Sequence, residues 1–417
     1  MRIIVAHYKY YIQGGPERYM FKFMDLAERN GCEVIPFSVN YKLNQKTSYS
    51  KYFVGTEESG GNYDASNHKL SYLLKSAWHE FHNFEAARNL KKLIKETKPD
   101  LLYVLIPGQL TTDIFKVAHK AGIPVILRIS DFRTICGNNI LLSEGELCED
   151  CIHGKYGFCY KKRCVKNSKM LSLLRAISLN YARKHKKYRY VDAVITPPSF
   201  TANKLVESGF FPKEKVHVLP TFVDTKSIKP SNSFGNYVLC LGRFSPEKGF
   251  DSVLRALQYL KDLPIKVAIT GTKENCDPRI KKLIEELNIG QQVSFVGFLS
   301  GDKLSEITSN CLCVACPALW YENMPNVVLE AFAYGKPVVA TDIGSLSEIV
   351  INEHNGLLFP RNDDKELANC IRRLFSDSDL RKRLGDNARR DAELHYSPEK
   401  HFVGFLEIVN SLKKGNR

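Results

Sequence analysis

The chain contains no apolar run close to the ~18–20 residues that span a bilayer. Its first residues, MRIIVAHYKYY, are too few and too mixed in character for a signal peptide. A fixed-period repeat and a low-complexity tract are also absent. With 44% apolar residues, these absences argue against membrane-spanning, fibrous and disordered classes. We expect a globular, cytoplasmic protein of two or three domains.

Acidic residues are scarce: 45 Asp plus Glu stand against 60 Lys plus Arg, which gives a net charge of +15. This imbalance favours an anionic partner, such as a nucleic acid, a phosphorylated small molecule or an acidic membrane. The scarcity is greatest between Cys151 and Val191, where twelve Lys or Arg occur and no acid.

The same basic stretch has apolar residues at helical spacing, at Met170, Leu173, Leu174, Ile177 and Tyr181. A basic amphipathic helix can lie on an anionic membrane. It can equally pack its apolar stripe on the sheet and show its lysines to water. We favour the packed helix, with its basic face near a membrane or a phosphorylated acceptor.

Short apolar runs alternate with amphipathic helical patterns along the whole chain. This alternation predicts βαβ units and mainly parallel sheets. The runs that predict strands are 2–6, 34–37, 101–106, 124–129, 191–196, 236–241, 265–270, 293–296, 312–315, 337–340 and 356–359. Two series of about 200 residues each hold more strands than one open sheet comfortably accommodates. We therefore predict an α/β protein with two doubly wound, Rossmann-like domains.

The polar segment 226–235, KSIKPSNSFG, is the best candidate for a linker. It suggests one domain at 1–228 and a second at 229–395, and we expect the helical segment 396–417 to return to the first domain. Open α/β sheets bind ligands at the carboxyl ends of their strands. Two such domains that face each other would therefore bind a ligand in the cleft between them.

The first candidate site reads GRFSPEKG, from Gly242 to Gly249, directly after a predicted strand. Gly242 allows the chain to leave the strand tightly. Arg243 and Lys248 lie where both can reach an anion held at a helix N-terminus. A guanidinium fork and an ammonium point charge suit a pyrophosphate. The alternative is two solvated cations on a βα loop.

The second candidate site is the pair Glu322 and Glu330, in the segment PALWYENMPNVVLEAFAYGKPVVATDIGSLSEIV. Pro325 suits the first turn of a helix, which places Glu322 in the preceding loop and Glu330 inside the helix. Both carboxylates can then face one ligand, and a carboxylate accepts well from two vicinal hydroxyls. The alternative is a helix-capping acid and an unrelated surface glutamate.

Together the two segments resemble the glycosyltransferase family 4 group, whose members have the GT-B fold. The resemblance is carried by 317–350, by GRFSPEKG, by Gly14-Gly15-Pro16-Glu17 after the first strand and by TFVD at 221–224. It implies transfer of a sugar from a UDP- or GDP-sugar to an acceptor, with retention at the anomeric carbon and no cofactor required for catalysis. It also implies a role in bacterial capsule, exopolysaccharide or lipopolysaccharide assembly. The acceptor would be a glycan or a lipid-linked molecule, and the protein would work at the inner face of the membrane.

The resemblance also implies residue roles. Arg243 and Lys248 would hold the donor diphosphate and stabilise the charge of the leaving group. Glu322 would contact the donor sugar, and Glu330 would bind the ribose hydroxyls. The other donor-binding positions that it implies are Gly14, Gly15, Gly242, Gly271, Phe298, Asn323, Met324, Pro325 and Asn326.

One position departs from the family pattern. Members commonly carry His-Asp after the fourth strand of the first domain, where this chain has Ser130-Asp131. Serine cannot act as a cation or as an efficient acid or base at neutral pH. Either Ser130 or Asp131 positions the sugar, or another residue compensates. His7, at the end of the first strand, is a candidate, although a lone histidine there is more often structural.

Five of the twelve cysteines fall in a glycine- and polar-rich loop at 136–164. A loop of this length inside a compact domain usually has a function or a staple. Cys148 and Cys151, with two of Cys159, Cys164 and Cys136, could form a tetrahedral structural zinc site. Cys159 and Cys164 are the preferred pair, and His153 is a weaker candidate ligand. The alternative is reduced thiols without a metal.

Three other functions fit parts of the sequence. A GT-B sugar-nucleotide epimerase would bind the same donor without an acceptor, but the paired glutamates and GRFSPEKG favour a transferase. Ser130 favours a catalytically silent partner subunit of this fold, whereas the retained basic and acidic pairs disfavour it. A zinc-dependent nucleic-acid-binding protein would explain the charge, but the cysteine spacings fit no recognisable finger, and we expect no nucleic-acid partner.

Overall fold

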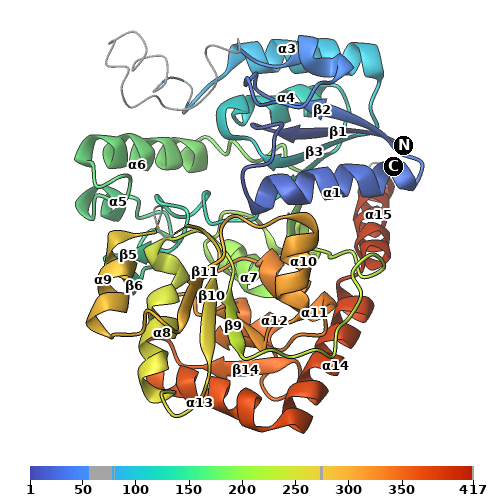
Figure 1. Cartoon of the computed structure of the whole chain (residues 1–417). Coiled ribbons are helices and arrows are strands. Elements are labelled where there is room, and N and C mark those ends of the chain that lie inside the picture. Colours follow the sequence, from blue (N-terminus) through green and yellow to red (C-terminus); the bar gives the residue numbers. More distant parts are fainter. Residues whose placement is uncertain (56–77, 79, 273–275, 416–417) are drawn as a thin grey trace. The chain divides into compact units, whose positions relative to one another are not determined.

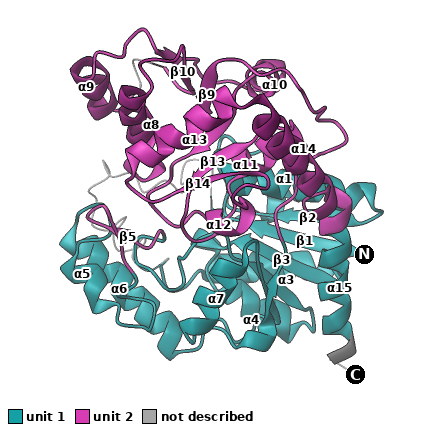
Figure 2. Cartoon of the chain, turned by 90° about the horizontal axis from the view of Figure 1, so that it is seen from below, with its two compact units in different colours: residues 1–139, 149–219, 402–417 teal, residues 140–148, 220–401 magenta. Residues whose placement is uncertain are grey.

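The computed structural model describes residues 1–55, 78, 80–272 and 276–415. The chain divides into two compact units, drawn in different colours in Figure 2. Unit 1 is Met1–Asn139, Glu149–Leu219 and Phe402–Arg417, and unit 2 is Ile140–Cys148 and Pro220–His401. None of the described helices is both long enough and apolar enough to cross a membrane.

The sheet of unit 1 has the strand order β2-β1-β3-β4-β7-β8, and every neighbouring pair is parallel. Its strands are β1 (Arg2–His7), β2 (Glu33–Phe37), β3 (Leu101–Ile106), β4 (Val125–Arg128), β7 (Ala193–Thr196) and β8 (Val216–Val218). β3 reads LLYVLI and is buried along its whole length, as expected of a strand covered on both faces. The strand order reverses between β1 and β3, so a crevice is expected at their carboxyl ends.

Helices alternate with these strands along the chain in unit 1, as in βαβ units (Figure 1). They are α1 (Gly15–Arg29), α3 (Phe84–Thr97), α4 (Asp113–Lys120), α5 (Gly157–Lys161), α6 (Lys169–Lys184) and α7 (Ser199–Glu207), with short 3₁₀ turns η1 (Ser48–Tyr52), η3 (Gly108–Leu110) and η4 (Lys213–Lys215). Helix α7 and strand β8 were not predicted from the sequence, because both are short and only partly apolar.

The last helix, α15 (Pro398–Gly415), has most of its length in unit 1. Phe405 is fully buried there, and its ring lies 4.9 Å from that of Phe23 in α1 and 5.1 Å from that of Tyr103 in β3. Buried aromatic groups of this size contribute much of the apolar area of a core. The end of the chain is therefore part of the core of unit 1.

Helix α6 packs differently from our expectation. Its buried residues are Ser172, Ala176, Ser178 and Leu179. This face lies on the cysteine-rich loop, in an apolar cluster with Tyr156 and Cys159. The predicted stripe residues Met170, Leu173 and Ile177 are instead 71%, 45% and 50% exposed. The expectation of a buried stripe was wrong for these three residues, whereas Leu174 and Tyr181 of the same stripe are half-buried.

The sheet of unit 2 has the order β11-β10-β9-β12-β13-β14, again with parallel pairs throughout. Its strands are β9 (Tyr237–Cys240), β10 (Lys266–Ile269), β11 (Val293–Phe295), β12 (Cys313–Cys316), β13 (Val338–Thr341) and β14 (Gly356–Phe359). Its helices are α8 (Phe250–Ala256), α9 (Pro278–Glu286), α10 (Gly301–Ser309), α11 (Asn326–Ala333), α12 (Leu346–Ile349), α13 (Asp364–Ser376) and α14 (Ser378–His395), with η5 (Pro246–Lys248) and η6 (Leu257–Tyr259). Alternate residues of β9 enter two apolar clusters, so both faces of this sheet are covered. The predicted pair of doubly wound sheets is confirmed.

A short hairpin of β5 (Leu142–Ser143) and β6 (Glu146–Leu147) is grouped with unit 2, although it interrupts unit 1 in the sequence. Arg361 holds this hairpin: its guanidinium lies 2.9 Å from the Glu146 carboxylate and also donates to the carbonyl oxygen of Gly145. The hairpin could not be predicted from the sequence, because its polar loop has no strand-like run.

Candidate functional site

In unit 2, the turn after β9 lies against the segment after β12. Gly249 has a left-handed backbone with φ of +67°, and a Cβ atom on it would lie 1.9 Å from the carbonyl oxygen of Pro317. The backbone N–H of Leu319 donates to the carbonyl oxygen of Glu247 at 2.9 Å. Only glycine permits this approach. Gly249 therefore allows the basic and acidic motifs of the sequence to come together.

Lys248 and Glu322 meet at this contact. Their side chains form an ion pair at 2.6 Å, with Lys248 22% and Glu322 7% exposed. The indole N–H of Trp320 donates to the same carboxylate oxygen at 3.0 Å, and the ammonium group lies 5.5 Å from the centre of the indole ring. The Ser345 hydroxyl donates to the carbonyl oxygen of Glu322. The result is a compact charged cluster in a loop that is fixed from two sides.

Opposing effects set the charge of Lys248. Burial lowers its pKa, but the Glu322 carboxylate, by attraction and by hydrogen bonding, raises the pKa above its ordinary value. The ammonium group therefore keeps its charge at neutral pH. Arg243 lies on the same turn and is exposed. The turn presents one fixed cation and one cation that is open to solvent, which suits an anionic ligand.

The segment after Glu322 forms the start of a helix. Pro325 is the N-cap of α11 and Asn326 is its first residue, while Glu330 lies further along and is partly buried. Met324 lies in the preceding loop, and its sulfur accepts the backbone N–H of Thr221 at 3.1 Å. The predicted positions Asn323, Met324, Pro325 and Asn326 thus lie together at a helix N-terminus. Such a terminus has backbone N–H groups without partners inside the helix.

Two further predicted positions, Gly271 and Phe298, follow the neighbouring strands β10 and β11. Gly271 and Gly297 exchange two backbone hydrogen bonds of 2.8 and 2.9 Å. A Cβ atom on Gly271 would lie 2.3 Å from the ring of Phe244, so the glycine admits this ring. Phe298 is 81% exposed. The carboxyl edge of this sheet therefore carries an exposed aromatic ring beside closely packed backbone.

In unit 1, Gly14 and Gly15 lie where β1 gives way to α1. Gly14 is the N-cap in an extended backbone, and its N–H donates to the Glu17 carboxylate at 2.8 Å. Any residue could adopt this backbone, so the glycines are not required for a left-handed turn. Their small size leaves the N-terminus of a 15-residue helix accessible.

His7 is a structural residue rather than a substitute for the missing family histidine. It is 1% exposed, and its Nδ1 accepts the backbone N–H of Lys9 at 3.0 Å. Burial lowers the pKa of His7 to about 3, so the imidazole is neutral. Its Nε2 lies 3.8 Å from the Glu17 carboxylate, too far for a hydrogen bond. An enclosed, neutral ring of this kind has no access to a substrate.

Ser130 and Asp131 follow β4 and line a pocket of unit 1. The other lining residues include Leu105, Pro107, Arg128 and Tyr188. Arg133, which the sequence analysis did not single out, grips Asp131 with two N–H groups at 2.8 and 2.5 Å. A bidentate guanidinium fixes the position and orientation of the carboxylate that it holds. Asp131 is therefore suited to binding and orientation, and the motif Asp-x-Arg was the available signal for Arg133.

Three of the four predicted zinc ligands, Cys151, Cys159 and Cys164, share one apolar cluster of unit 1, and a zinc site at these cysteines stays a prediction. Cys148 is grouped with unit 2, whereas Cys151, Cys159 and Cys164 belong to unit 1. A hydrogen bond with Cys164, together with burial, raises the pKa of Cys159. Within the described ranges, no group of three or more His, Cys, Asp or Glu side chains is arranged to hold a metal ion. None of the twelve cysteines, all of them described, forms a disulfide.

Two residues that contact Glu322, Trp320 and Ser345, were not predicted from the sequence. Trp320 stands two residues before Glu322 and is one of only two tryptophans, which could have marked it. Ser345 lies 23 residues beyond Glu322, and no local pattern connects them.

Comparison with known proteins gives concordant matches. Residues 224–391 match the family model described as Glycosyl transferases group 1. An uncharacterized glycosyltransferase, MJ1178, of Methanocaldococcus jannaschii is 29% identical over 296 residues, which are 66% of this chain and 78% of that protein. A D-inositol 3-phosphate glycosyltransferase of Stackebrandtia nassauensis is 32% identical over 218 residues, 47% of this chain and 49% of the relative. The crystal structure of Anabaena Alr3699/HepE in complex with UDP-glucose is similar with a TM-score of 0.66 and 18% identity, over 99% of this chain and 100% of that one.

Proposed function

Because the chain belongs to the group 1 glycosyl transferases and has a GT-B fold, we propose that it is a retaining hexosyltransferase that uses a UDP- or GDP-sugar. The sugar would pass to a glycan or a lipid-linked acceptor during assembly of a surface polysaccharide such as capsule, exopolysaccharide or lipopolysaccharide. The observation that carries this proposal is the cluster of Lys248, Glu322 and Trp320. The cluster lies inside the residues that match the family model. The narrower assignment to glycosyltransferase family 4 is part of the proposal.

The cations would act on the leaving group. Cleavage of the bond between the sugar and the diphosphate places negative charge on the departing nucleotide. Lys248 and Arg243, on one turn, would stabilise this charge as it develops. The ion pair with Glu322 already orients Lys248, so little reorganisation is needed when the donor binds.

The carboxylates would recognise hydroxyl groups. Both polar contacts of the Glu322 carboxylate use Oε1, which leaves Oε2 to accept from a hydroxyl of the donor sugar. Glu330, inside α11, would accept from the ribose hydroxyls. The backbone N–H groups at the start of α11 would bind the diphosphate or the sugar, as helix N-termini bind anions.

Residues of unit 1 would serve the other substrate and the phosphates. Gly14 and Gly15, at the N-terminus of α1, would face the diphosphate. Ser130 and Asp131, which follow β4, would position a sugar, with Arg133 fixing the carboxylate.

The proposal includes peripheral contact with an anionic membrane, at its inner face, through α5 and α6. Met170, Leu173 and Ile177 project from α6, and the exposed rings of Phe158 and Tyr160 belong to α5. The surrounding sequence carries twelve cations and no acid. An exposed apolar stripe flanked by lysines is typical of helices that lie at a membrane surface.

Thermal stability in the presence of nucleotides tests the donor proposal. A ligand at about 100 times its dissociation constant adds roughly 2.7 kcal/mol to the free energy of unfolding. We expect one of UDP, GDP or their sugar conjugates to raise the melting temperature of the wild type, and the rise to shrink in Lys248→Met. Lys282→Met is the matched control, because Lys282 forms an exposed ion pair with Glu286 in the same unit.

The outcomes separate the proposal from its alternatives. If none of the nucleotides raises the melting temperature of the folded protein, donor binding is contradicted and a silent partner subunit is favoured. Interconversion of two epimeric sugar nucleotides without any acceptor would instead assign an epimerase.

A further inference from the structure

Three aromatic rings gather in unit 1 beside the segment that follows β3, and nothing above assigns them a role. Trp78 and Phe84 are 52% and 63% exposed. The His82 ring contacts both, with centroid distances of 5.5 Å to Trp78 and 5.6 Å to Phe84, against which it is stacked. Trp78 and Phe84 also lie 6.2 Å from each other. Large aromatic faces that remain exposed on a folded protein commonly mark a ligand contact.

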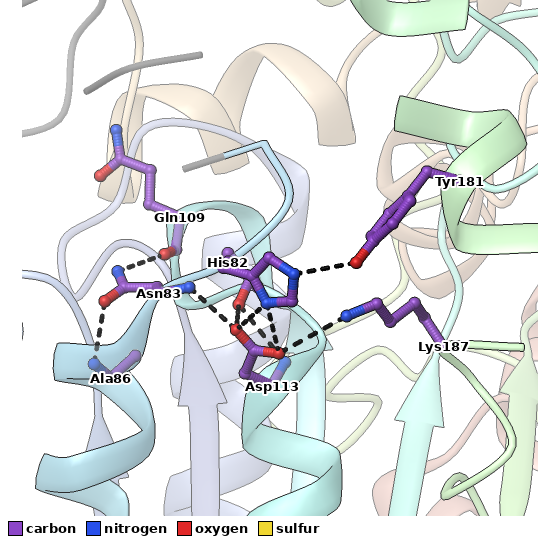
Figure 3. Close-up of polar contacts among 8 residues, drawn as sticks. His82, Asn83, Ala86, Gln109, Asp113, Tyr181 and Lys187 are labelled. Atoms are coloured by element: carbon purple, nitrogen blue, oxygen red, sulfur yellow. Dashed lines mark hydrogen bonds and ion pairs between the residues drawn. The ribbon is translucent and has the colours of Figure 1, made fainter. Parts of the chain in front are cut away.

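Polar groups surround the His82 ring (Figure 3). His82 Nδ1 lies 3.1 Å from the Asp113 carboxylate, and its Nε2 lies 3.0 Å from the phenol oxygen of Tyr181. The Lys187 ammonium approaches Asp113 to 3.8 Å. The side chains of His82, Asp113 and Lys187 are 20%, 16% and 18% exposed, so all three are accessible. The cluster offers donors and acceptors within reach of one small ligand.

The backbone around the cluster is held rigidly. Asn83 is the N-cap of α3: its side chain accepts the N–H of Ala86 at 2.9 Å and donates to the carbonyl oxygen of Gln109 at 2.7 Å. Its own N–H donates to Asp113 at 2.9 Å. Thr111 has φ of +59° and ψ of −179°, which a β-branched residue rarely adopts, and its hydroxyl contacts Asp113 at 3.3 Å. Such strain gathers at functional sites, where surrounding structure enforces it.

We propose that this cluster is a binding subsite for a pyranose unit of the acceptor. The C–H face of the sugar would stack on Trp78 and Phe84. Its hydroxyls would exchange hydrogen bonds with Asp113, Tyr181 and Lys187, and His82 would hold Asp113 and Tyr181 in position. The inference rests on the proposed function, since it supplies the acceptor side of the transfer.

The subsite lies where an acceptor is expected in this unit. Asp113 begins the helix that follows β3, at the carboxyl edge of the sheet, where open α/β sheets bind ligands. The neighbour of Lys187 along the chain, Tyr188, lines the pocket that Ser130 and Asp131 also line.

The chemistry of the cluster favours a sugar over a lipid surface. An anionic membrane attracts cations and repels carboxylates. Here the Asp113 carboxylate stands at the centre of the polar groups, and a second acid, Glu80, lies 3.7 Å from Arg175 nearby. A polyhydroxylated ligand uses donors and acceptors alike, and its ring supplies the apolar face.

The chain has only two tryptophans, and each lies at one of the two sites, which makes a direct test possible. In the Trp320→Phe variant, the fluorescence reports on Trp78 alone. We titrate it with the methyl glycosides of glucose, galactose, mannose and N-acetylglucosamine. At least one should change the emission saturably. His82→Ala should weaken that response about tenfold, as expected for a lost hydrogen bond and ring contact.

Two controls make the outcome specific. Tyr259→Ala, which removes an aromatic ring that is 50% exposed in unit 2, should leave the Trp78 response unchanged. Anionic phospholipid vesicles should not shift the Trp78 emission. No saturable change with any of the four glycosides in folded protein would overturn the subsite, and so would a blue shift with vesicles alone, which would assign the rings to a membrane surface.

The complementary variant separates this inference from the proposed function. In Trp78→Phe, the fluorescence reports on Trp320, and UDP and GDP are the probes. If UDP and GDP cause no response in Trp78→Phe, while a glycoside causes a saturable response in Trp320→Phe, the donor proposal is refuted and the sugar site is supported. The reverse result refutes the subsite and supports the donor proposal.

Discussion

Replacing Gly249 by alanine tests how the donor-side cluster is built. The new Cβ would lie 1.9 Å from the carbonyl oxygen of Pro317 and 3.0 Å from its carbonyl carbon, both backbone atoms that cannot rotate away. Left-handed backbone costs a non-glycine residue about 1–2 kcal/mol, and relieving an overlap of this kind typically costs a further 1–3 kcal/mol. We expect Gly249→Ala to lower the free energy of unfolding of unit 2 by about 2–5 kcal/mol and to separate Lys248 from Glu322.

Two other glycines of unit 2 divide this effect into its parts. Gly301 has φ of +55° and open space around its Cβ position, so Gly301→Ala should show only the backbone cost of about 1–2 kcal/mol. Gly290 has neither a left-handed backbone nor a neighbour within 4 Å, so Gly290→Ala should be close to neutral. Urea unfolding followed by Trp320 fluorescence, in the Trp78→Phe background, measures all three locally. Equal stability of Gly249→Ala and Gly301→Ala would refute the reasoning, because the overlap with Pro317 would then carry no cost.

Three further predictions concern charge and the exposed stripe. Lys248→Met leaves the buried Glu322 carboxylate without its partner, so it should lower the free energy of unfolding in urea by about 2 kcal/mol or more. The double variant Lys248→Met/Glu322→Gln should recover much of this stability. An equal loss of stability in the single and double variants would argue against a stabilising ion pair. Burial lowers the pKa of His7 from 6.5 to about 3 in the folded chain, so the unfolded chain binds more protons between these values. Stability should therefore fall as the pH drops below about 6.5, by up to about 1.4 kcal/mol per pH unit, and an unchanged slope in His7→Gln would contradict this. Met170→Ser/Ile177→Ser should reduce co-sedimentation with phosphatidylserine vesicles at least about tenfold, whereas equal binding would remove the stripe from the membrane proposal.

Much of the fold could be predicted from the sequence, because each strand of a parallel sheet is a short, continuous apolar run. The run LLYVLI and the run that forms β9 can be recognised as strands from their local sequence alone. The hairpin of β5 and β6 did not, because it depends on Arg361, more than 200 residues away. The exposed stripe of α6 was misplaced for a related reason: periodicity identifies an apolar face but not which of two faces a neighbour covers.

The candidate site, like the fold, could be predicted from the sequence only in part. Lys248 and Glu322 stand in motifs with recognisable spacing, so the sequence identified both. Their contact depends on the backbone of Gly249 against Pro317, which no spacing reveals. Trp78 and His82 belong to no motif at all, and only the packing of α3, α4 and α6 brings them to Asp113 and Tyr181.

Release of nucleoside diphosphate from UDP- and GDP-sugars, with and without a pool of glycan acceptors, tests the central claim most directly. The account predicts turnover of one donor by the wild type. It predicts a loss of at least about a hundredfold in both Lys248→Met and Glu322→Gln, because each removes a preorganised charge. Lys282→Met and Glu286→Gln, the matched exposed pair, should turn over at the wild-type rate. Near-normal turnover in Lys248→Met and Glu322→Gln, with the wild type active, would contradict the account.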